Sequence, residues 1–143
     1  MANVNGTLGN DVLSGTEFAD VIDGLDGDDV INGGLGADVL NGGFGNDIFR
    51  WTSILVSSGS LPIGAVDGGP GYDIVDVSAV SPTSVSSFTL TGFTLSVGSQ
   101  RFITTNVEEV RFGSGNDYVS LTTAGAIAMR LGGGNDQTFS SVG

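Results

Sequence analysis

Two consecutive nonapeptides read Gly33-Gly-Leu-Gly-Ala-Asp38-Val-Leu-Asn41 and Gly42-Gly-Phe-Gly-Asn-Asp47-Ile-Phe-Arg50. Three further copies of the same unit precede them, so that residues 6–50 are five nonapeptides in phase. Every copy has Gly at its first position and Asp at its sixth, followed by Val or Ile and then by a larger apolar residue. A fixed period of this kind, matched at four positions in every copy, is typical of a repeat architecture.

Each unit is long enough for one short strand and one turn, but too short for a helix and a turn. Gly at the turn positions permits positive φ and close approach of the backbone. The triplet of Asp, Val and Leu type predicts a short strand whose eighth residue points inward. Two units then form one coil of 18 residues, and alternate units stack to give two parallel sheets.

The seventh residues should lie on the outer faces of these sheets, because successive side chains of a strand alternate. They are Val12, Val21, Val30, Val39 and Ile48. Two interpretations remain open. The preference of Val and Ile for strands accounts for them on exposed surfaces, whereas a covered stripe requires the hairpin predicted below, or a partner molecule, to lie over it.

Stacking of the coils aligns the sixth-position aspartates. Asp11, Asp29 and Asp47 fall on one side, and Asp20 and Asp38 on the other. With coils about 4.8 Å apart, an ion midway between two carboxylates lies about 2.4 Å from each, which is the Ca²⁺–oxygen distance. Without an ion these like charges repel, so we expect calcium binding and folding to be one event. The alternative, that Asp and Gly only form turns, does not explain Asp in all five copies.

The composition excludes several classes of function. The chain has 143 residues, the length of a single domain, with 16 acidic and 4 basic residues and a net charge of −12. This charge argues against nucleic acid and anionic membranes as partners and favours a cation. The absence of Cys and His excludes thiolate and imidazole metal sites. Because Lys is absent as well, the usual acid–base groups are missing and we predict no enzyme. No apolar run reaches the ~20 residues of a membrane span.

The period breaks after Phe49. Residues 51–66 are expected to be an insertion, a loop or short strand packed on the coils, and a sixth unit, Gly68-Gly-Pro-Gly-Tyr-Asp73-Ile-Val-Asp76, follows within residues 67–81 and extends to Val77. Residues 82–106 predict a loop and a β-hairpin turning at Gly98-Ser99, which flanks or caps the coils.

Residues 107–143 predict a second, less regular repeat array. Asp117 and Asp136 are 19 residues apart, and they share an ion if the extra residue bulges outward. Glu108 and Glu109 are predicted to lie on a solvated strand edge.

The units beginning at Gly33, Gly42 and Gly68 resemble the Gly-Gly-x-Gly-x-Asp-x-hydrophobic-x motif of the repeats-in-toxin (RTX) family of haemolysin-type calcium-binding repeats. The resemblance implies an all-β fold, a right-handed parallel β-roll (β-solenoid) of 18-residue coils with Ca²⁺ between stacked turns. It also implies a protein of a Gram-negative bacterium that leaves the cell by type I secretion and folds outside or at the cell surface. The start, Met1-Ala-Asn-Val-Asn5, lacks the basic and apolar regions of a cleavable signal peptide. The resemblance accounts for this, because type I secretion implies export without such a signal.

Members of that family bind calcium through the sixth-position carboxylate and through main-chain carbonyls that include the first and third positions. Carried over unit by unit, the implied ligands are Gly6, Leu8 and Asp11; Gly15, Glu17 and Asp20; Gly24, Asp26 and Asp29; Gly33, Leu35 and Asp38; Gly42, Phe44 and Asp47; Gly68, Pro70 and Asp73; and Asp117 and Asp136. Thr16 and Phe18 depart from the motif, which predicts a distorted turn and a weak site at Asp20.

The function expected from the sequence is that of a module that binds several Ca²⁺ ions, folds after export and stabilises a larger secreted protein. The alternative is a module for calcium-dependent adhesion, surface-layer assembly or polysaccharide binding. Calcium-dependent oligomers, or retention on a polysaccharide, would distinguish this alternative from a purely structural role.

Overall fold

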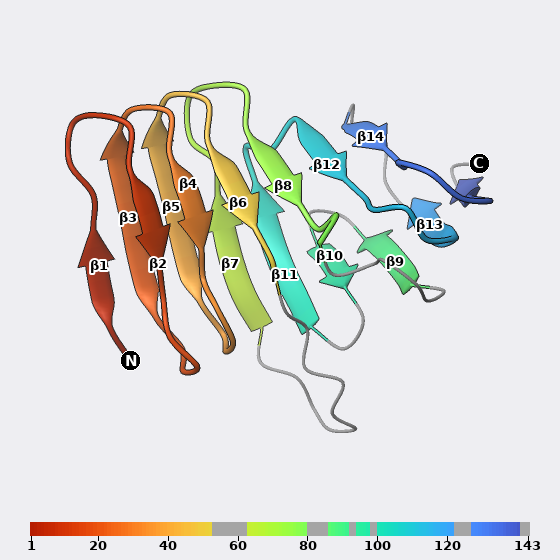
Figure 1. The fold of residues 1–143 in the computed structure, drawn as a ribbon, viewed down its shortest axis with the longest axis horizontal. Coiled ribbons are helices and arrows are strands. Elements are labelled where there is room, and N and C mark those ends of the chain that lie inside the picture. Colours follow the sequence, from red (N-terminus) through yellow and green to blue (C-terminus); the bar gives the residue numbers. More distant parts are fainter. Residues whose placement is uncertain (53–62, 80–85, 92–93, 98–99, 122–126, 141–143) are drawn as a thin grey trace.

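The computed structural model describes residues 1–52, 63–79, 86–91, 94–97, 100–121 and 127–140. Within these residues the chain is built from strands that form two sheets (Figure 1). The same residues contain no helix long and apolar enough to span a membrane. The predicted all-β class is therefore confirmed.

From residue 3 to residue 76 successive strands alternate between the two sheets (Figure 1). The larger sheet has nine described strands in the order β1 (Asn3–Asn5), β3 (Val21–Asp26), β5 (Val39–Phe44), β7 (Ile63–Asp67), β11 (Gln100–Thr105), β10 (Thr94–Val97), β9 (Ser86–Thr91), β13 (Asp117–Leu121) and β15 (Gln137–Ser140). The smaller sheet has six described strands in the order β14 (Ala128–Arg130), β12 (Glu109–Arg111), β8 (Ile74–Asp76), β6 (Ile48–Arg50), β4 (Val30–Asn32) and β2 (Val12–Ser14).

The register of the strands confirms the predicted coil. In the larger sheet Val21 lies opposite Val39, and in the smaller sheet Val12 lies opposite Val30; both pairings are parallel and 18 residues apart. The fold is thus a parallel β-roll. We call the turns 6–11, 24–29, 42–47 and 68–73, which lead from the larger to the smaller sheet at the top of Figure 1, the upper turns. The turns 15–20 and 33–38, which lead back, are the lower turns.

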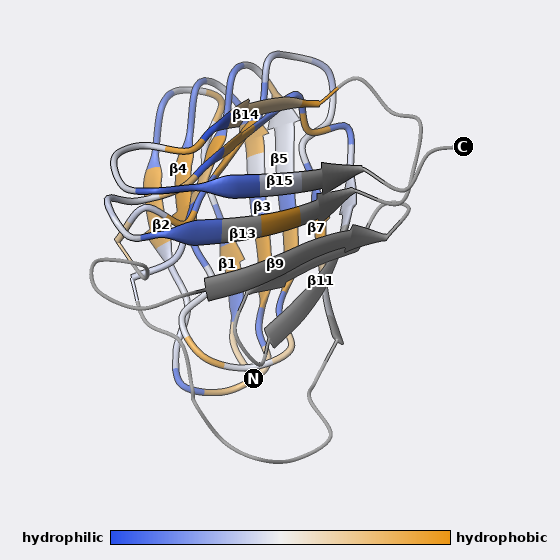
Figure 2. Ribbon diagram, turned by 90° about the vertical axis from the view of Figure 1, so that its right-hand side faces the viewer, coloured by the Kyte–Doolittle hydropathy of each residue, from blue (hydrophilic) through white to orange (hydrophobic). Residues whose placement is uncertain are grey.

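The core lies between the two sheets and is built from the eighth residue of each unit, as predicted. Ile22, Ile31 and Phe49 are inaccessible to solvent, and Leu40 is 1% exposed. Figure 2 shows hydrophobic colour on many of the strands and hydrophilic colour on many of the turns. Burying a side chain of this size contributes about 1.5–3 kcal/mol, so one inward residue per strand provides the main adhesion between the sheets.

The seventh residues lie on the outer faces. Val12 is 81% and Val39 49% exposed, whereas Val21, Val30 and Ile48 are half-buried. The strands of the predicted hairpin do not lie over either stripe, because they pair edge to edge within the larger sheet. Two explanations of Val and Ile at the seventh positions therefore remain, the preference of these residues for strands and cover by a partner molecule.

The predicted hairpin is confirmed, but its expected place beside or capping the coils is wrong. β10 pairs antiparallel with β11, with Val97 opposite Gln100, and the turn 98–99 lies outside the described residues. β11 pairs in parallel with β7, while β9 pairs in parallel with β13. The hairpin and β9 therefore continue the larger sheet across the break in the repeat, because each open sheet edge offers a row of backbone groups to the next strand.

The insertion also differs from the prediction. Ile63–Asp67 form β7, a regular strand with Val66 opposite Leu40, rather than a segment packed on the coils; residues 53–62 lie outside the described residues. β8 ends at Asp76 and does not include Val77, although the Val77 side chain is fully buried. The nonapeptide template could not recognise β7, because only the inward position of Val66 is retained after the insertion.

Candidate metal centre

The upper turns stack their sixth-position aspartates in one ladder. The backbone N–H of Asp11 donates to Asp29 Oδ1 at 2.8 Å, and Asp29 N–H donates in the same way to Asp47 Oδ1 at 2.8 Å. Asp47 N–H then donates to Asp73 Oδ1 at 2.8 Å, across the insertion. Each carboxylate therefore reaches back to the preceding coil, which brings these four aspartates together as the sequence predicted.

The lower turns repeat the arrangement. Asp20 N–H donates to Asp38 Oδ1 at 3.0 Å, and the Asp20 carboxylate itself accepts the N–H of Ala2. In the second array Asp117 N–H donates to Asp136 Oδ1 at 3.0 Å. The 19-residue spacing does not prevent this stacking, because β13 and β15 pair with the same offset, Tyr118 lying opposite Gln137.

The second carboxylate oxygen distinguishes four of these aspartates from the others. The Oδ2 atoms of Asp29, Asp38, Asp47 and Asp73 are buried and accept no hydrogen bond, and each of the four residues is at most 1% exposed. Buried polar atoms are nearly always hydrogen-bonded, and a buried charge is costly unless it is paired. A ligand of opposite charge is the simplest explanation of four such oxygens on a repeated motif.

The first-position glycines leave room next to these oxygens. A Cβ atom at Gly42 would lie 2.2 Å from Asp47 Oδ2 and 2.6 Å from the carbonyl oxygen of Gly68 in the next coil. A Cβ at Gly24 would meet Asp29 Oδ2 and the Gly42 carbonyl oxygen, both at 2.3 Å. A carboxylate oxygen and a main-chain carbonyl thus face the same small space. These all-oxygen donors fit Ca²⁺, which takes carboxylates and backbone carbonyls as ligands.

Burial raises the pKa of these carboxyls. It raises the pKa of Asp38 and of Asp73 to about 6, with a further contribution from the neighbouring charges of Asp20 and Asp47, respectively. The pKa values of Asp29 and Asp47 are raised for the same reason. The ionised form of these carboxyls is therefore disfavoured unless a cation neutralises its charge.

The third-position residues are placed differently. The side chains of Leu8, Glu17, Asp26, Phe44 and Pro70 are exposed, and Leu35 is half-buried. The carbonyl oxygens of Phe44 and Pro70 accept the N–H groups of Gly27 and Gly45. Within the described part of the chain no three acidic side chains converge on one point. A cation at the ladder would therefore need main-chain carbonyls besides the stacked carboxylates.

The prediction of a solvated edge at Glu108 and Glu109 is wrong. Glu108 occupies the next place on the upper ladder, where its Oε2 accepts the N–H of Asp73 at 2.8 Å. Glu109 is 1% exposed. Strand alternation alone could not reveal this burial, since Tyr72 and Arg130 from other coils, together with Arg111 on the same strand, surround Glu109.

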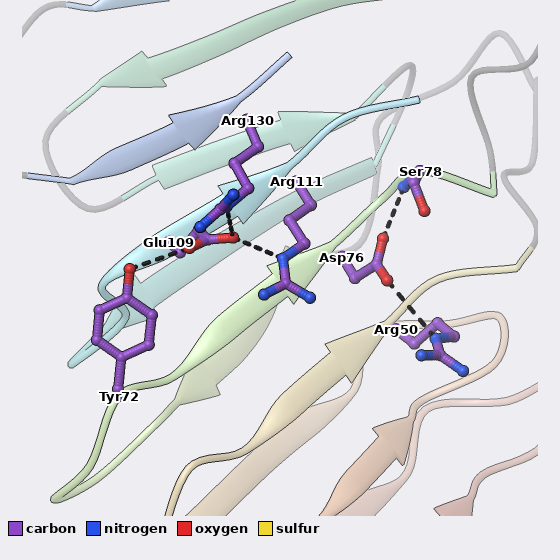
Figure 3. Close-up of polar contacts among 7 residues, drawn as sticks. All are labelled: Arg50, Tyr72, Asp76, Ser78, Glu109, Arg111 and Arg130. Atoms are coloured by element: carbon purple, nitrogen blue, oxygen red, sulfur yellow. Dashed lines mark hydrogen bonds and ion pairs between the residues drawn. The ribbon is translucent and has the colours of Figure 1, made fainter. Parts of the chain in front are cut away.

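The buried Glu109 side chain is the centre of a charge network whose arginines are partly or largely exposed to solvent (Figure 3). Its Oε1 accepts hydrogen bonds from Arg111 Nε and from Arg130 Nε, and its Oε2 accepts one from the Tyr72 hydroxyl at 3.0 Å. The hydrogen bond from Arg111 is the main reason why the pKa of Glu109 is below its ordinary value. The network ties the sixth unit to two strands of the second array, β12 and β14.

Removing both cations, in the variant Arg111→Ala with Arg130→Ala, should destabilise the roll by about 3–5 kcal/mol, because it leaves a buried carboxylate without its charged partners. Arg50→Ala is the matched control: Arg50 pairs with Asp76 at 3.7 Å in a half-exposed position (Figure 3), and such a pair contributes about 0–1 kcal/mol. Urea unfolding in saturating calcium measures both. Equal losses in the two variants would contradict a structural role for the Glu109 network.

The sequence analysis also missed a second ladder at the fifth position. Asn10 Oδ1 accepts the N–H of Asp28, Asp28 Oδ1 accepts that of Asn46, and Asn46 Oδ1 accepts that of Tyr72, at 2.7–2.9 Å. Asn116 and Asn135 repeat the contact in the second array. The signal was present in the sequence, since Asn or Asp recurs at the fifth position of these turns. This ladder joins the coils without a metal.

Comparison with known families agrees with this geometry. The family model of the RTX calcium-binding nonapeptide repeat matches residues 5–40 and, in a second alignment, residues 14–49. These matches cover the five regular units and with them Asp11, Asp20, Asp29, Asp38 and Asp47. A search of curated proteins found no match to the chain. Residues 5–49 therefore carry RTX calcium-binding nonapeptide repeats.

Proposed function

We propose that this calcium-binding chain folds on binding Ca²⁺ after export and stabilises a secreted protein. The observation that carries the proposal is the set of buried Oδ2 atoms without hydrogen-bond partners on Asp29, Asp38, Asp47 and Asp73. Leaving several ionised carboxylates buried and stacked opposes folding, since neither desolvation nor mutual repulsion is compensated. A divalent cation removes both costs.

The residues that would hold the ions are the sixth-position aspartates with a partnerless Oδ2 atom, Asp29, Asp38, Asp47 and Asp73, together with main-chain carbonyls of first and third positions. A bound ion supplies positive charge and cross-links adjacent coils. The chain itself contributes the spacing, since glycine at the first position leaves open the space beside each Oδ2. Because metal binding of this kind creates the folded state, its free energy becomes folding free energy.

The role we infer is structural rather than catalytic. The chain has no His and no Lys, and aspartates that bind an ion must stay ionised, which removes them from acid–base chemistry. The match of residues 5–49 to RTX repeats supports secretion from a Gram-negative bacterium, where a chain that needs calcium would fold only outside the calcium-poor cytosol.

A calcium titration followed by far-UV circular dichroism tests the proposal, with magnesium as the control. We expect a cooperative gain of β-signal at about 10⁻⁴ to 10⁻³ M calcium, the range of extracellular modules, and little response to magnesium. Sedimentation velocity at both ends of the titration distinguishes a monomeric module from one that self-associates. A chain that is fully folded without metal and unchanged by calcium would refute the proposal.

A further inference from the structure

The first two turns differ from all later nonapeptide turns at their second residue. In the turns 6–11 and 15–20 this residue is Thr7 or Thr16, whereas in the next four turns it is Leu25, Gly34, Gly43 or Gly69. These four residues have positive φ, from 81° at Leu25 to 103° at Gly43. Neither of the first two turns, both of which the structure describes in full, contains a residue with positive φ.

The change of backbone conformation alters what the aspartate meets. Asp11 Oδ2 accepts two hydrogen bonds from Thr7, one from N–H at 2.5 Å and one from Oγ1 at 2.8 Å. Asp20 Oδ2 accepts the same two bonds from Thr16, at 2.6 and 2.7 Å. The threonine hydroxyl also accepts the N–H of the fourth residue, Gly9 or Phe18, at 3.2 and 3.1 Å. The two turns thus share the same three hydrogen bonds between threonine, aspartate and the fourth residue.

In the later turns 33–38 and 42–47 the backbone N–H of the second residue does not donate to the aspartate of its own turn. Gly34 N–H donates to Asn32 Oδ1 at 3.0 Å, and Gly43 N–H donates to the Gly68 carbonyl at 3.1 Å. The Oδ2 atoms of Asp38 and Asp47 in these turns accept no hydrogen bond. The contrast is reflected in the pKa values, since the hydrogen bond from the Thr16 hydroxyl lowers the pKa of Asp20 whereas burial raises that of Asp38.

We propose, building on the proposed function, that Thr7 and Thr16 replace calcium in the first two turns, so that the metal sites begin at the third turn. The hydrogens of the threonine N–H and O–H groups carry partial positive charge and occupy the position at Oδ2 that a cation would need. A donor and a cation cannot both take the same side of one oxygen. The turns 6–11 and 15–20 are therefore metal-free caps that form without calcium and offer a folded surface to the coil that follows.

The experiment counts bound calcium by native mass spectrometry on the full chain. Asp11→Asn and Asp20→Asn should each bind as many ions as the wild type, whereas Asp47→Asn, the matched control in a later turn, should bind fewer. Thr7→Gly restores the Gly-Gly pair of the family motif and should bind one ion more than the wild type. Thr7→Val, which removes the hydroxyl but keeps the N–H and a β-branched residue, should gain none.

Three outcomes would count against these statements in different ways. Loss of an ion in Asp11→Asn or Asp20→Asn overturns the inference and leaves the proposed function intact. An unchanged count in Thr7→Gly also overturns it, provided that circular dichroism shows the variant to fold in calcium; if the variant does not fold, the asparagine variants decide. A wild-type chain without bound calcium overturns the proposed function and this inference together.

Discussion

Replacing Asp29 and Asp47 together by asparagine should stabilise the protein without metal and destabilise it in saturating calcium. Both residues are buried and each carries an Oδ2 atom that accepts no hydrogen bond. Asparagine keeps the oxygen that accepts the N–H of the preceding coil and removes the charge. Relief of an unsatisfied buried group is worth about 1–3 kcal/mol per site, and the two effects will not be additive because the residues are neighbours on one ladder.

In saturating calcium the same substitutions should instead lower the stability of the protein, since each removes a charged ligand. We expect fewer bound ions and at least a tenfold rise in the calcium concentration at the midpoint of folding, a change of about 1.4 kcal/mol. Glu17→Gln with Asp26→Asn is the matched control: it changes the net charge by the same amount, at exposed side chains whose main-chain carbonyls remain in place. Far-UV circular dichroism of the metal-free chains, which reports how much of each is folded, together with urea unfolding in calcium and calcium titrations, gives the comparison for both double variants. Destabilisation of Asp29→Asn with Asp47→Asn in both conditions would show that the carboxylates hold the fold without a metal.

The metal-free protein should lose stability as the pH rises from about 4 to about 6, and the calcium-loaded protein should gain it. Burial raises the pKa of Asp38 and Asp73 to about 6, whereas these groups titrate near 3.9 in an unfolded chain. Between these values the folded state binds more protons than the unfolded state, so that stability falls with rising pH. A shift of one pKa unit corresponds to about 1.4 kcal/mol, so the loss from two carboxyls amounts to several kcal/mol.

Calcium inverts the dependence because it competes with these protons for the same carboxylates. Asp20 and Glu109 act in the opposite direction, since their pKa values are lowered, but the stability they provide is lost only below the ordinary carboxyl range. The measurement is far-UV circular dichroism of metal-stripped and calcium-saturated protein at about pH 4 and about pH 7, at the two ends of the range between the unfolded and folded pKa values. Parallel pH profiles in the two states would contradict a ladder that exchanges protons for calcium.

The coil and its core could be predicted because the same pattern of residues recurs in every unit of the repeat. Five units place Gly, Asp and two apolar residues at the same positions, and strand alternation then assigns Ile22, Ile31, Leu40 and Phe49 to the interior. The alignment of the aspartates followed from the same period. Outside the repeat the prediction was weaker. The hairpin of residues 94–97 and 100–103 was recognised from local pattern, but its place in the larger sheet was not, since the pairing of β11 with β7 and of β9 with β13 joins segments distant in sequence.

The sequence by itself determined the repeat, the parallel β-roll and the oxygen chemistry of its turns, because each depends on contacts between residues one period apart. Only the tertiary structure decided in which carboxylates both oxygens accept hydrogen bonds and in which one oxygen accepts none. Thr7 and Thr16 close their turns on Asp11 and Asp20, while positive φ at the second residue leaves Asp29, Asp38, Asp47 and Asp73 with an oxygen that accepts no hydrogen bond. It also revealed Glu109 as a buried charge. These differences depend on the direction of single N–H and O–H groups and on side chains from other coils, which residue spacing does not specify.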